Sequence, residues 1–555
     1  MKKILLPLVF PALIGLSACS DGKVTNTSEV ENKPAAETVS NFDEAYASIT
    51  DEKIRAPLKT LSSDEFEGRL PTTAGEKKTT DFLVQEFKAA GYQPGNEGSY
   101  LQEVALMEIT ANPDMQMTIG DNTFNYKDDM VASSRREQST VNLDDSELVF
   151  VGYGVNAPEY NWNDYEGIDV KGKTVVILVN DPGFENPDNG KFQGTTMTYY
   201  GRWSYKYEEA SRQGAAGALI VHETAPASYP WSVVANSWSG PQYGLVTGDG
   251  GASRVAVEGW LTLDAAKKVF ADADMNFEEE KAKAAQGPYS QPMNVKASVT
   301  VKNNFKKSKS YNVIATLPGA KTPDEHVIYT AHWDHLGKDE SLKGDQIYNG
   351  AHDNATGTAA SIAMAQAFAK LSPRADRSIT FLIVTAEEQG LLGSKYYADH
   401  PIIPFNKTVA NINMDAMNVL GKTKDITVVG AGKSQMENYL EKAAKRQERN
   451  LTEEEHPEAG YYYRSDHFSF AKKGIPALYT EAGSEPSDDE TAKYRKRMNV
   501  IVRGCYHQVC DQYRDNWDLS GITQDAQLLF DVGVNVANAD SWPQWNSTSE
   551  FQRQN

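Results

Sequence analysis

The C-terminal half of the chain alternates short apolar runs with amphipathic stretches. Apolar runs of strand length cover residues 327–330, 379–385, 409–414 and 477–480, and an alanine-rich segment with helical periodicity, 355–371, separates the first two. Wholly apolar strands are buried on both faces, which is typical of parallel sheets that carry helices on each side. The pattern therefore predicts an α/β fold over residues 291–545, with a mostly parallel mixed sheet flanked by helices.

A segment of different character interrupts this domain. Residues 43–100 predict two amphipathic helices ahead of Gly91, whereas from about residue 146 the pattern becomes β-rich, with strands at 148–154, 174–179 and 218–221 and a helix at 205–213. No cluster of carboxylates and histidines occurs in this second segment. We therefore predict that residues 43–145 form the N-terminal part of the α/β domain and that residues 146–290 are a β-rich insert.

The first residues indicate export. Lys2 and Lys3 precede an apolar stretch, 4–16, which ends at the small residues Ser17 and Ala18 before Cys19. This arrangement resembles a bacterial lipoprotein signal (1–19) that is cleaved before Cys19, and an ordinary secretory signal is the alternative. The polar residues 20–42 predict a flexible tether. The resemblance implies a protein of the bacterial cell envelope that contacts the membrane only through an N-terminal lipid anchor.

Length and charge limit the classes of partner. A chain of 555 residues is too long for one ordinary core, so more than one domain is expected. The formal net charge of −21 repels phosphate backbones, which excludes nucleic acid as an expected partner. In an exported protein Cys505 and Cys510 are expected to form a disulfide, and two reduced buried thiols are the alternative.

Five side chains in the C-terminal half are candidate metal ligands: His332, Asp353, Glu388, Asp415 and His507. Most of them directly follow a predicted strand, and in such sheets ligands gather at the carboxyl ends of the strands. A pair of zinc ions needs two imidazoles, one carboxylate that can bridge the ions, and one further carboxylate for each ion. The five side chains supply this set. Taken singly, each motif has a structural alternative, such as a core histidine or a helix-capping aspartate.

Neighbouring residues are candidates for the chemistry. Asp334 lies two residues after His332, where its carboxylate is expected to accept the second ring N–H of that histidine. Glu387 and Glu388 are adjacent at the end of an apolar strand and repel each other without a cation, which suggests a general base beside a ligand. Tyr506 is a candidate donor to the oxyanion, with a packed core tyrosine as the alternative. His335 is set aside, because loop packing explains it equally well.

These motifs resemble those of the co-catalytic dinuclear zinc exopeptidases, a family that includes secreted bacterial aminopeptidases and glutamate carboxypeptidase. The resemblance rests on "AHWDHLG", "NGAHDNATG", "VTAEEQGLLGS", "ANINMDAMN" and "CYHQVCDQYRDNWDLSG". The insert is similar to a protease-associated domain, through "KGKTVVIL" and "EEASRQGAAGALIV". The segment "RSDHFSFAKKGIPALYTEAG" resembles one that walls the specificity pocket in the family, so residues 464–467 are further candidates.

The resemblance implies two Zn²⁺ per chain and a role for each ligand. His332 and Asp415 would hold one zinc, Glu388 and His507 the other, and Asp353 would bridge them. Glu387 would be the general base. A cis peptide between Asp353 and Asn354 is also implied.

The expected activity is hydrolysis of a peptide substrate near one chain terminus, most simply as an aminopeptidase. A glutamate carboxypeptidase-like dipeptidase is an alternative, because Arg202, Lys206 and Arg464 could recognise a carboxylate. Glutaminyl-cyclase-like acyl transfer is a second alternative, although that design resembles a one-zinc site. The absence of HExxH and G-x-S-x-G from the sequence removes support for helix-borne zinc proteases and serine hydrolases.

Overall fold

The computed structural model describes residues 41–547 and 549–553. The predicted signal segment and nearly all of the predicted tether lie outside these residues. None of the helices in the described part of the chain is long and apolar enough to cross a membrane.

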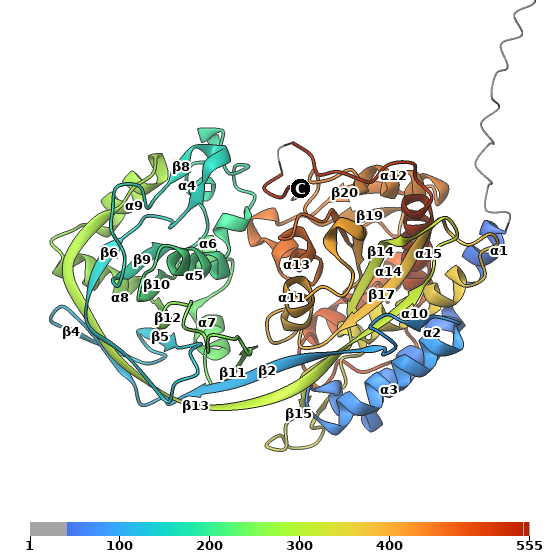
Figure 1. Cartoon of the computed structure of the whole chain (residues 1–555), viewed down its shortest axis with the longest axis horizontal. Coiled ribbons are helices and arrows are strands. Elements are labelled where there is room, and N and C mark those ends of the chain that lie inside the picture. The colour runs from blue at the N-terminus through green and yellow to red at the C-terminus, as the bar shows by residue number, and fades with distance from the viewer. Residues whose placement is uncertain (1–40, 548, 554–555) are drawn as a thin grey trace, which may run out of the picture. The chain divides into compact units, whose positions relative to one another are not determined.

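The catalytic sheet has the predicted mixed, mostly parallel arrangement. Strands β17, β14, β18 and β21 run parallel in that order, and the end of β13 pairs antiparallel with β17 (Figure 1). The bounds are Gln291–Leu317 for β13, Thr322–His332 for β14, Arg377–Val384 for β17, Thr408–Asn413 for β18 and Ala477–Ala482 for β21. All four predicted strands are present, which confirms the α/β fold class.

The strand register aligns the carboxyl ends of three neighbouring strands. His332 pairs with Val384 across β14 and β17, and Thr330 pairs with Asn413 across β14 and β18. Residues that follow these ends therefore emerge at one edge of the sheet, which is where ligands collect in open α/β sheets.

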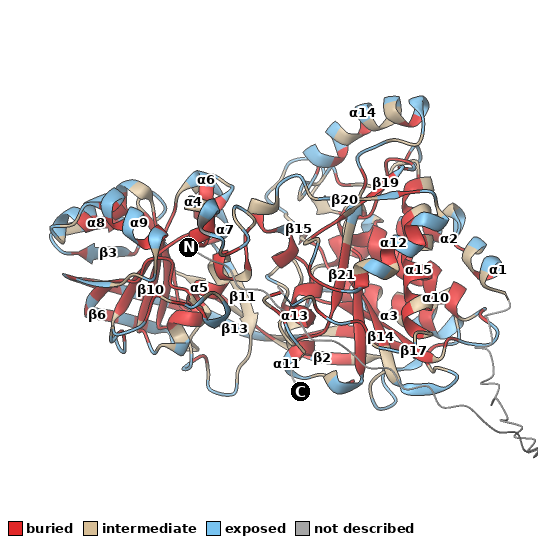
Figure 2. Ribbon diagram, turned by 90° about the horizontal axis from the view of Figure 1, so that it is seen from above, coloured by how far each residue is buried: buried red, intermediate tan, exposed pale blue. Residues whose placement is uncertain are grey.

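Helices cover both faces of this sheet, because successive strand side chains point to opposite sides. Val327 and Tyr329 pack into a core shared with α2 (Asp51–Leu61), α3 (Ala74–Ala89), α10 (Thr356–Phe368) and α15 (Ser520–Ala537). Ile328, between them, packs into a separate core with α11 (Leu392–Asp399) and α13 (His467–Ala471). Figure 2 shows the central strands, α10 and α15 as mostly buried.

Helix α10 begins where the backbone is crowded. A Cβ on Gly357 would lie 2.5 Å from Asn354 Oδ1 and 2.7 Å from the carbonyl oxygen of Met414, so only glycine fits without a shift. The helix is rich in alanine and almost fully buried, which lets its backbone approach the sheet closely. This close approach places the residues just before α10 against the loop that follows β18.

The insert has its own sheet, in which β6, β9, β10 and β12 run parallel and β5 pairs antiparallel with β12. The bounds are Met130–Ser133 for β5, Thr140–Phe150 for β6, Thr174–Leu178 for β9, Gly217–Val221 for β10 and Val257–Leu261 for β12. One hydrophobic core of the insert extends from Met115 to Val301, and so beyond the predicted range of 146–290. The predicted helix at 205–213 corresponds to α5, Trp203–Arg212.

Two long strands connect the insert to the catalytic sheet. Strand β13 pairs with β6 in the insert, then with β2 (Leu101–Ala111), and finally with β17 in the catalytic sheet (Figure 1). The N-terminal segment contains three α-helices, α1 (Phe42–Ala47), α2 and α3, where the sequence predicted two. The additional helix, α1, is short, and only residues 48–50 separate it from α2.

Candidate metal centre

The five predicted ligands converge at the carboxyl edge of the catalytic sheet. His332 is the last residue of β14, whereas Glu388 and Asp415 lie in the loops after β17 and β18. Asp353 lies just ahead of α10, and His507 follows α14, Asp489–Gly504. The ligands come from five separate segments, so only the fold brings them together.

The first group surrounds the ring of His332. Its Nε2 lies 3.2 Å from Asp353 Oδ1 and 3.2 Å from Asp415 Oδ1. Zinc binds imidazole and carboxylate atoms at about 2.0–2.1 Å, which separates the ligand atoms of a tetrahedral ion by about 3.3 Å. These three atoms therefore have the spacing that one zinc ion requires.

The second group uses the other oxygen of the same aspartate. His507 Nε2 lies 3.1 Å from Asp353 Oδ2 and 3.0 Å from Glu388 Oε2. Asp353 thus faces one histidine and carboxylate pair with each of its oxygens, so its carboxylate could serve two metal ions. The donor atoms, all oxygen and imidazole nitrogen, fit a pair of zinc ions.

The charged side chains of this centre shift one another's pKa values. Burial acts to raise the pKa of Asp353, but hydrogen bonds from His332 and His507 outweigh burial and hold this pKa well below its usual range. Burial acts to lower the pKa of His507, but Asp353 and Glu388 raise it to about 10. Metal ligands must be deprotonated, so a bound cation would replace these shared protons.

Hydrogen bonds fix the backbone that carries Asp353. The Asp511 carboxylate accepts the N–H groups of His352 and Asp353, at 2.9 Å and 3.1 Å. The side chain of Asn354 donates to the carbonyl of Met414, 3.0 Å away, and so joins this loop to the loop of Asp415. The peptide between Asp353 and Asn354 is cis, as the family resemblance implied. Sequence analysis gave Asp511 no role.

Asp334 has a different partner from the one expected. Its Oδ1 lies 3.8 Å from His332 Nδ1, which is too far for a hydrogen bond, and the main-chain oxygen of Asp334 lies closer to that nitrogen, at 3.2 Å. The carboxylate instead accepts the N–H groups of Glu387 and Glu388, at 3.1 Å and 3.4 Å. Burial raises the pKa of Asp334 to about 7. The expected contact is therefore corrected: Asp334 orients the two glutamates through their backbone.

Glu387 lies beside the candidate ligands, but its carboxylate is farther from His332 than the carboxylates of Asp353 and Asp415 are. Its Oε2 is 3.8 Å from His332 Nε2, compared with 3.2 Å for the oxygens of Asp353 and Asp415. Burial raises the pKa of Glu387 well above its usual value. A carboxylate with a high proton affinity, beside candidate metal ligands but farther from His332 than they are, suits a general base.

Tyr506 is not a core residue. Its side chain is 56% exposed, and its ring stacks on the ring of His507 with centroids 3.9 Å apart. The packed core tyrosine considered from sequence is therefore wrong. The flanking residues Cys505 and Cys510 form the expected disulfide, which closes the loop that carries both aromatic rings.

The segment 464–467 contacts the centre through one residue. Ser465 Oγ donates to Asp415 Oδ2 at 2.6 Å and accepts from Asn413 Nδ2 at 2.7 Å. His467 is fully buried and packs between the rings of Tyr462 and Tyr479. This segment therefore holds Asp415 from the side opposite to His332.

Besides Asp511, sequence reasoning missed two further residues at the centre. His335 Nδ1 lies 2.5 Å from Glu388 Oε1, although this histidine had been set aside. Arg69 is buried behind the centre and donates hydrogen bonds to four carbonyl oxygens, those of Leu61, Trp333, Asn349 and Gly350. The second histidine of "AHWDHLG" was a usable signal for His335. Nothing in the sequence signals Arg69, because all its partners are backbone atoms.

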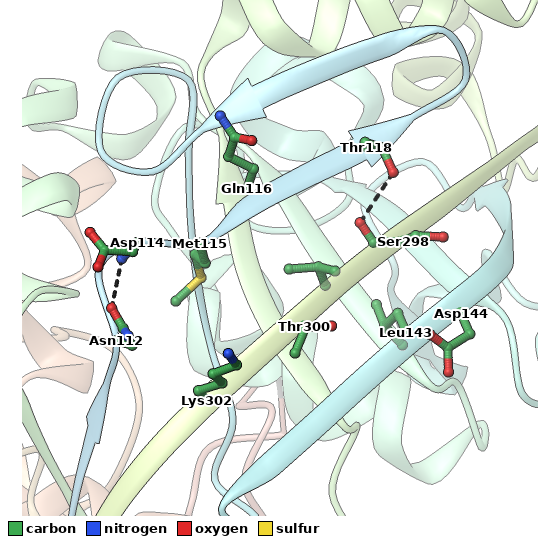
Figure 3. Close-up of a pocket in the computed structure, with 11 residues that line it drawn as sticks. Asn112, Asp114, Met115, Gln116, Thr118, Leu143, Asp144, Ser298, Thr300 and Lys302 are labelled. Atoms are coloured by element: carbon green, nitrogen blue, oxygen red, sulfur yellow. Dashed lines mark hydrogen bonds between the residues drawn. The ribbon is translucent and has the colours of Figure 1, made fainter.

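Two cavities lie away from the candidate ligands. One of about 580 Å³ opens on the insert between β3 (Gln116–Ile119), β6 and β13, and Figure 3 shows its mostly polar lining. A smaller one, of about 190 Å³, is lined by Arg202 and aromatic residues of the insert and by Arg464 of the catalytic domain. Neither cavity contains a cluster of candidate ligands.

The sequence of this chain is similar to those of known peptidases. Residues 312–530 match the model of "Peptidase family M28". The chain is 21% identical over 485 residues to a "probable leucine aminopeptidase 2" of Aspergillus oryzae, an alignment that covers 86% of this chain and 81% of the relative. It is 28% identical over 233 residues to an "Aminopeptidase" of Pseudomonas aeruginosa, with 40% of this chain and 39% of the relative covered.

Among solved structures, an aminopeptidase from Aneurinibacillus sp. strain AM-1 aligns with 93% of this chain and 100% of its own length, at 22% identity and a TM-score of 0.49. The family match covers β14, β17, β18 and β21 and all five candidate ligands. Residues 312–530 are therefore similar to peptidase family M28, and both relatives described above are named as aminopeptidases.

Proposed function

We propose that the protein is an aminopeptidase that uses two zinc ions per chain. The observation that carries this proposal is the position of Asp353, whose two oxygens lie 3.2 Å and 3.1 Å from the nitrogens of His332 and His507. A single metal would leave one of these groups without a ligand role. The three ligand carboxylates and the Glu387 carboxylate together balance the charge of two Zn²⁺, which makes burial of the site tolerable.

When bound, the zinc pair would polarise the scissile carbonyl and lower the pKa of an attacking water. Glu387 takes the proton of that water and passes it to the leaving amine, and its position outside the ligand spacing leaves it free to do so. Asp334 keeps Glu387 and Glu388 in place by accepting their backbone N–H groups. Tyr506, exposed beside His507, donates its hydroxyl to the developing oxyanion.

Recognition of the amino terminus is favoured over recognition of a carboxylate. Relatives whose alignments cover 86%, 47% and 40% of this chain are named aminopeptidases. Of the three cations considered for carboxylate binding, Lys206 is fully buried, and its ammonium donates to the carbonyls of Tyr153 and Asn180. Lys206 is therefore not available to a substrate. Neither the dipeptidase nor the cyclase alternative is supported by a comparable observation.

The test compares one leucine-initiated peptide with the same peptide acetylated at its amino terminus. The proposal predicts stepwise release of residues from the free peptide and none from the acetylated one. Equal cleavage of both peptides would contradict recognition of the amino terminus. A parallel zinc analysis of the purified protein should give about two zinc ions per chain.

The remaining features are proposed from sequence alone. We propose that the insert is a protease-associated domain and that the chain is exported and lipid-anchored at Cys19. Labelling of cells with a radioactive fatty acid tests the anchor: label should enter the wild-type protein and be absent from Cys19→Ala.

A further inference from the structure

We propose that His335 is a positioning residue of the second zinc site, which it serves by holding the outer oxygen of Glu388. This inference rests on the two-zinc function proposed above. His335 is not among the five ligands implied by the family resemblance, and it lies three residues after the first of them. Its ring is fully buried within the centre.

The distance from His335 to Glu388 identifies a hydrogen bond. His335 Nδ1 lies 2.5 Å from Glu388 Oε1, whereas atoms bound to the same tetrahedral zinc lie about 3.3 Å apart. His335, Asp353 and Glu388 do offer ligand atoms within 4.8 Å of one another, but the 2.5 Å between Nδ1 and Oε1 favours a direct hydrogen bond over two bonds to one ion. A short contact of this kind is typical of a charge-assisted hydrogen bond.

The proton of this bond belongs to the histidine. An ionised carboxylate only accepts hydrogen bonds, so Nδ1 of His335 carries the hydrogen. Nε2 of the same ring is buried and has no hydrogen-bond partner within the described residues. His335 is therefore the donor and Glu388 the acceptor of this hydrogen bond.

The ring of His335 is fixed by its surroundings. Gly350 has φ +55°, and a Cβ at this position would lie 2.5 Å from Cγ of His335, so the glycine makes room for the ring. The N–H of His335 donates to the carbonyl of Arg69 at 3.3 Å, and Arg69 in turn donates to the carbonyl of Gly350 at 2.8 Å. The donor is therefore held in place before any metal binds.

The candidate ligands around His332 show the same arrangement, in which a neighbouring donor holds one oxygen of a carboxylate. Asp415 presents Oδ1 to His332, while Ser465 donates to its Oδ2 at 2.6 Å. Glu388 presents Oε2 to His507 at 3.0 Å, while His335 donates to its Oε1. Each terminal carboxylate thus has one oxygen toward the metal position and one held by a neighbouring donor. Such outer partners typically change metal affinity by about 10–100-fold.

The test uses two variants of matched shape, His335→Asn and His335→Leu. Asparagine keeps an N–H donor close to the position of Nδ1, and leucine has the same branching without a donor. Zinc content is measured after dialysis against a competing chelator. We expect about two zinc ions in the wild type and in His335→Asn, and about one in His335→Leu, with a 10–100-fold weaker second affinity.

Double variants locate the affected ion. Adding Glu388→Gln to His335→Leu should leave the zinc content at about one ion, because both changes act on one site. Adding Asp415→Asn should remove the remaining ion. Thermal unfolding of each variant controls for loss of the fold.

The failures of the two proposals are distinguishable. A wild-type protein that binds no zinc overturns the proposed function. A wild type and a His335→Leu variant with the same two affinities overturn the role of His335 alone. Equal loss in the asparagine and leucine variants also overturns it, because only an imidazole that binds the metal directly would explain that result.

Discussion

Replacement of Glu387 by glutamine separates catalysis from metal binding, and Glu388→Gln is its matched control. The two side chains are adjacent, and each substitution removes one negative charge from the centre. Their distances differ: Glu388 Oε2 lies 3.0 Å from His507 Nε2, whereas Glu387 Oε2 lies 3.8 Å from His332 Nε2. Only the former matches the spacing of zinc ligands, about 3.3 Å. The comparison therefore isolates ligation from the general effect of charge.

The magnitude follows from the two roles. Loss of a general base typically slows turnover by about 10²–10⁴-fold, which raises the barrier by about 2.7–5.4 kcal/mol. Glu387→Gln should therefore reduce kcat by this amount and keep about two zinc ions per chain. Glu388→Gln should lose about one of them, because a terminal ligand is removed. Asp334 still holds both residues through their backbone in either variant.

The assay measures zinc by mass spectrometry and kcat with a leucine-initiated peptide, on the same samples and at buffered free zinc. Loss of zinc from Glu387→Gln with retention in Glu388→Gln would show that the two roles are exchanged. Full turnover in Glu387→Gln would refute the general base.

Three further predictions test the surroundings of the centre. Asp353→Ala should remove both zinc ions, since this carboxylate faces both histidines, and a variant that keeps its zinc would contradict the bridge. Arg69→Met should lower the free energy of unfolding by more than about 3 kcal/mol, because four buried carbonyls lose a donor; an unchanged denaturant midpoint would contradict this. Replacing Cys505 and Cys510 by serine should weaken zinc binding at the His507 site, measured by chelator competition, whereas unchanged affinity would show that the disulfide does not position this loop.

The catalytic sheet could be predicted because the central part of each parallel strand is mostly apolar and buried. Strand β17 is buried along its entire length, and its sequence leaves no other assignment. The start of β14 was missed because its first residues, from Thr322, are polar and partly exposed. Most of β13 was missed for the same reason: its middle, around Lys306, is polar and exposed, and it is held as a strand by pairing with β2.

The convergence of the five candidate ligands could be predicted because strand ends are visible in sequence and their carboxyl edges meet in the fold. Residues that act through hydrogen bonds to backbone groups could not be predicted from the sequence. Asp334 was expected to hold His332, but the loop after β17 brings the N–H groups of Glu387 and Glu388 within its reach instead. His335 was set aside because its spacing from His332 also fits loop packing, and only the tertiary structure places its ring against Glu388.

A crystal structure of the zinc-loaded protein, with anomalous scattering recorded at the zinc absorption edge, tests the central claim most directly. The account predicts two zinc peaks about 3.5–4 Å apart, with Asp353 between them, His332 at one and His507 at the other. A single peak, or two peaks that Asp353 does not bridge, would contradict it.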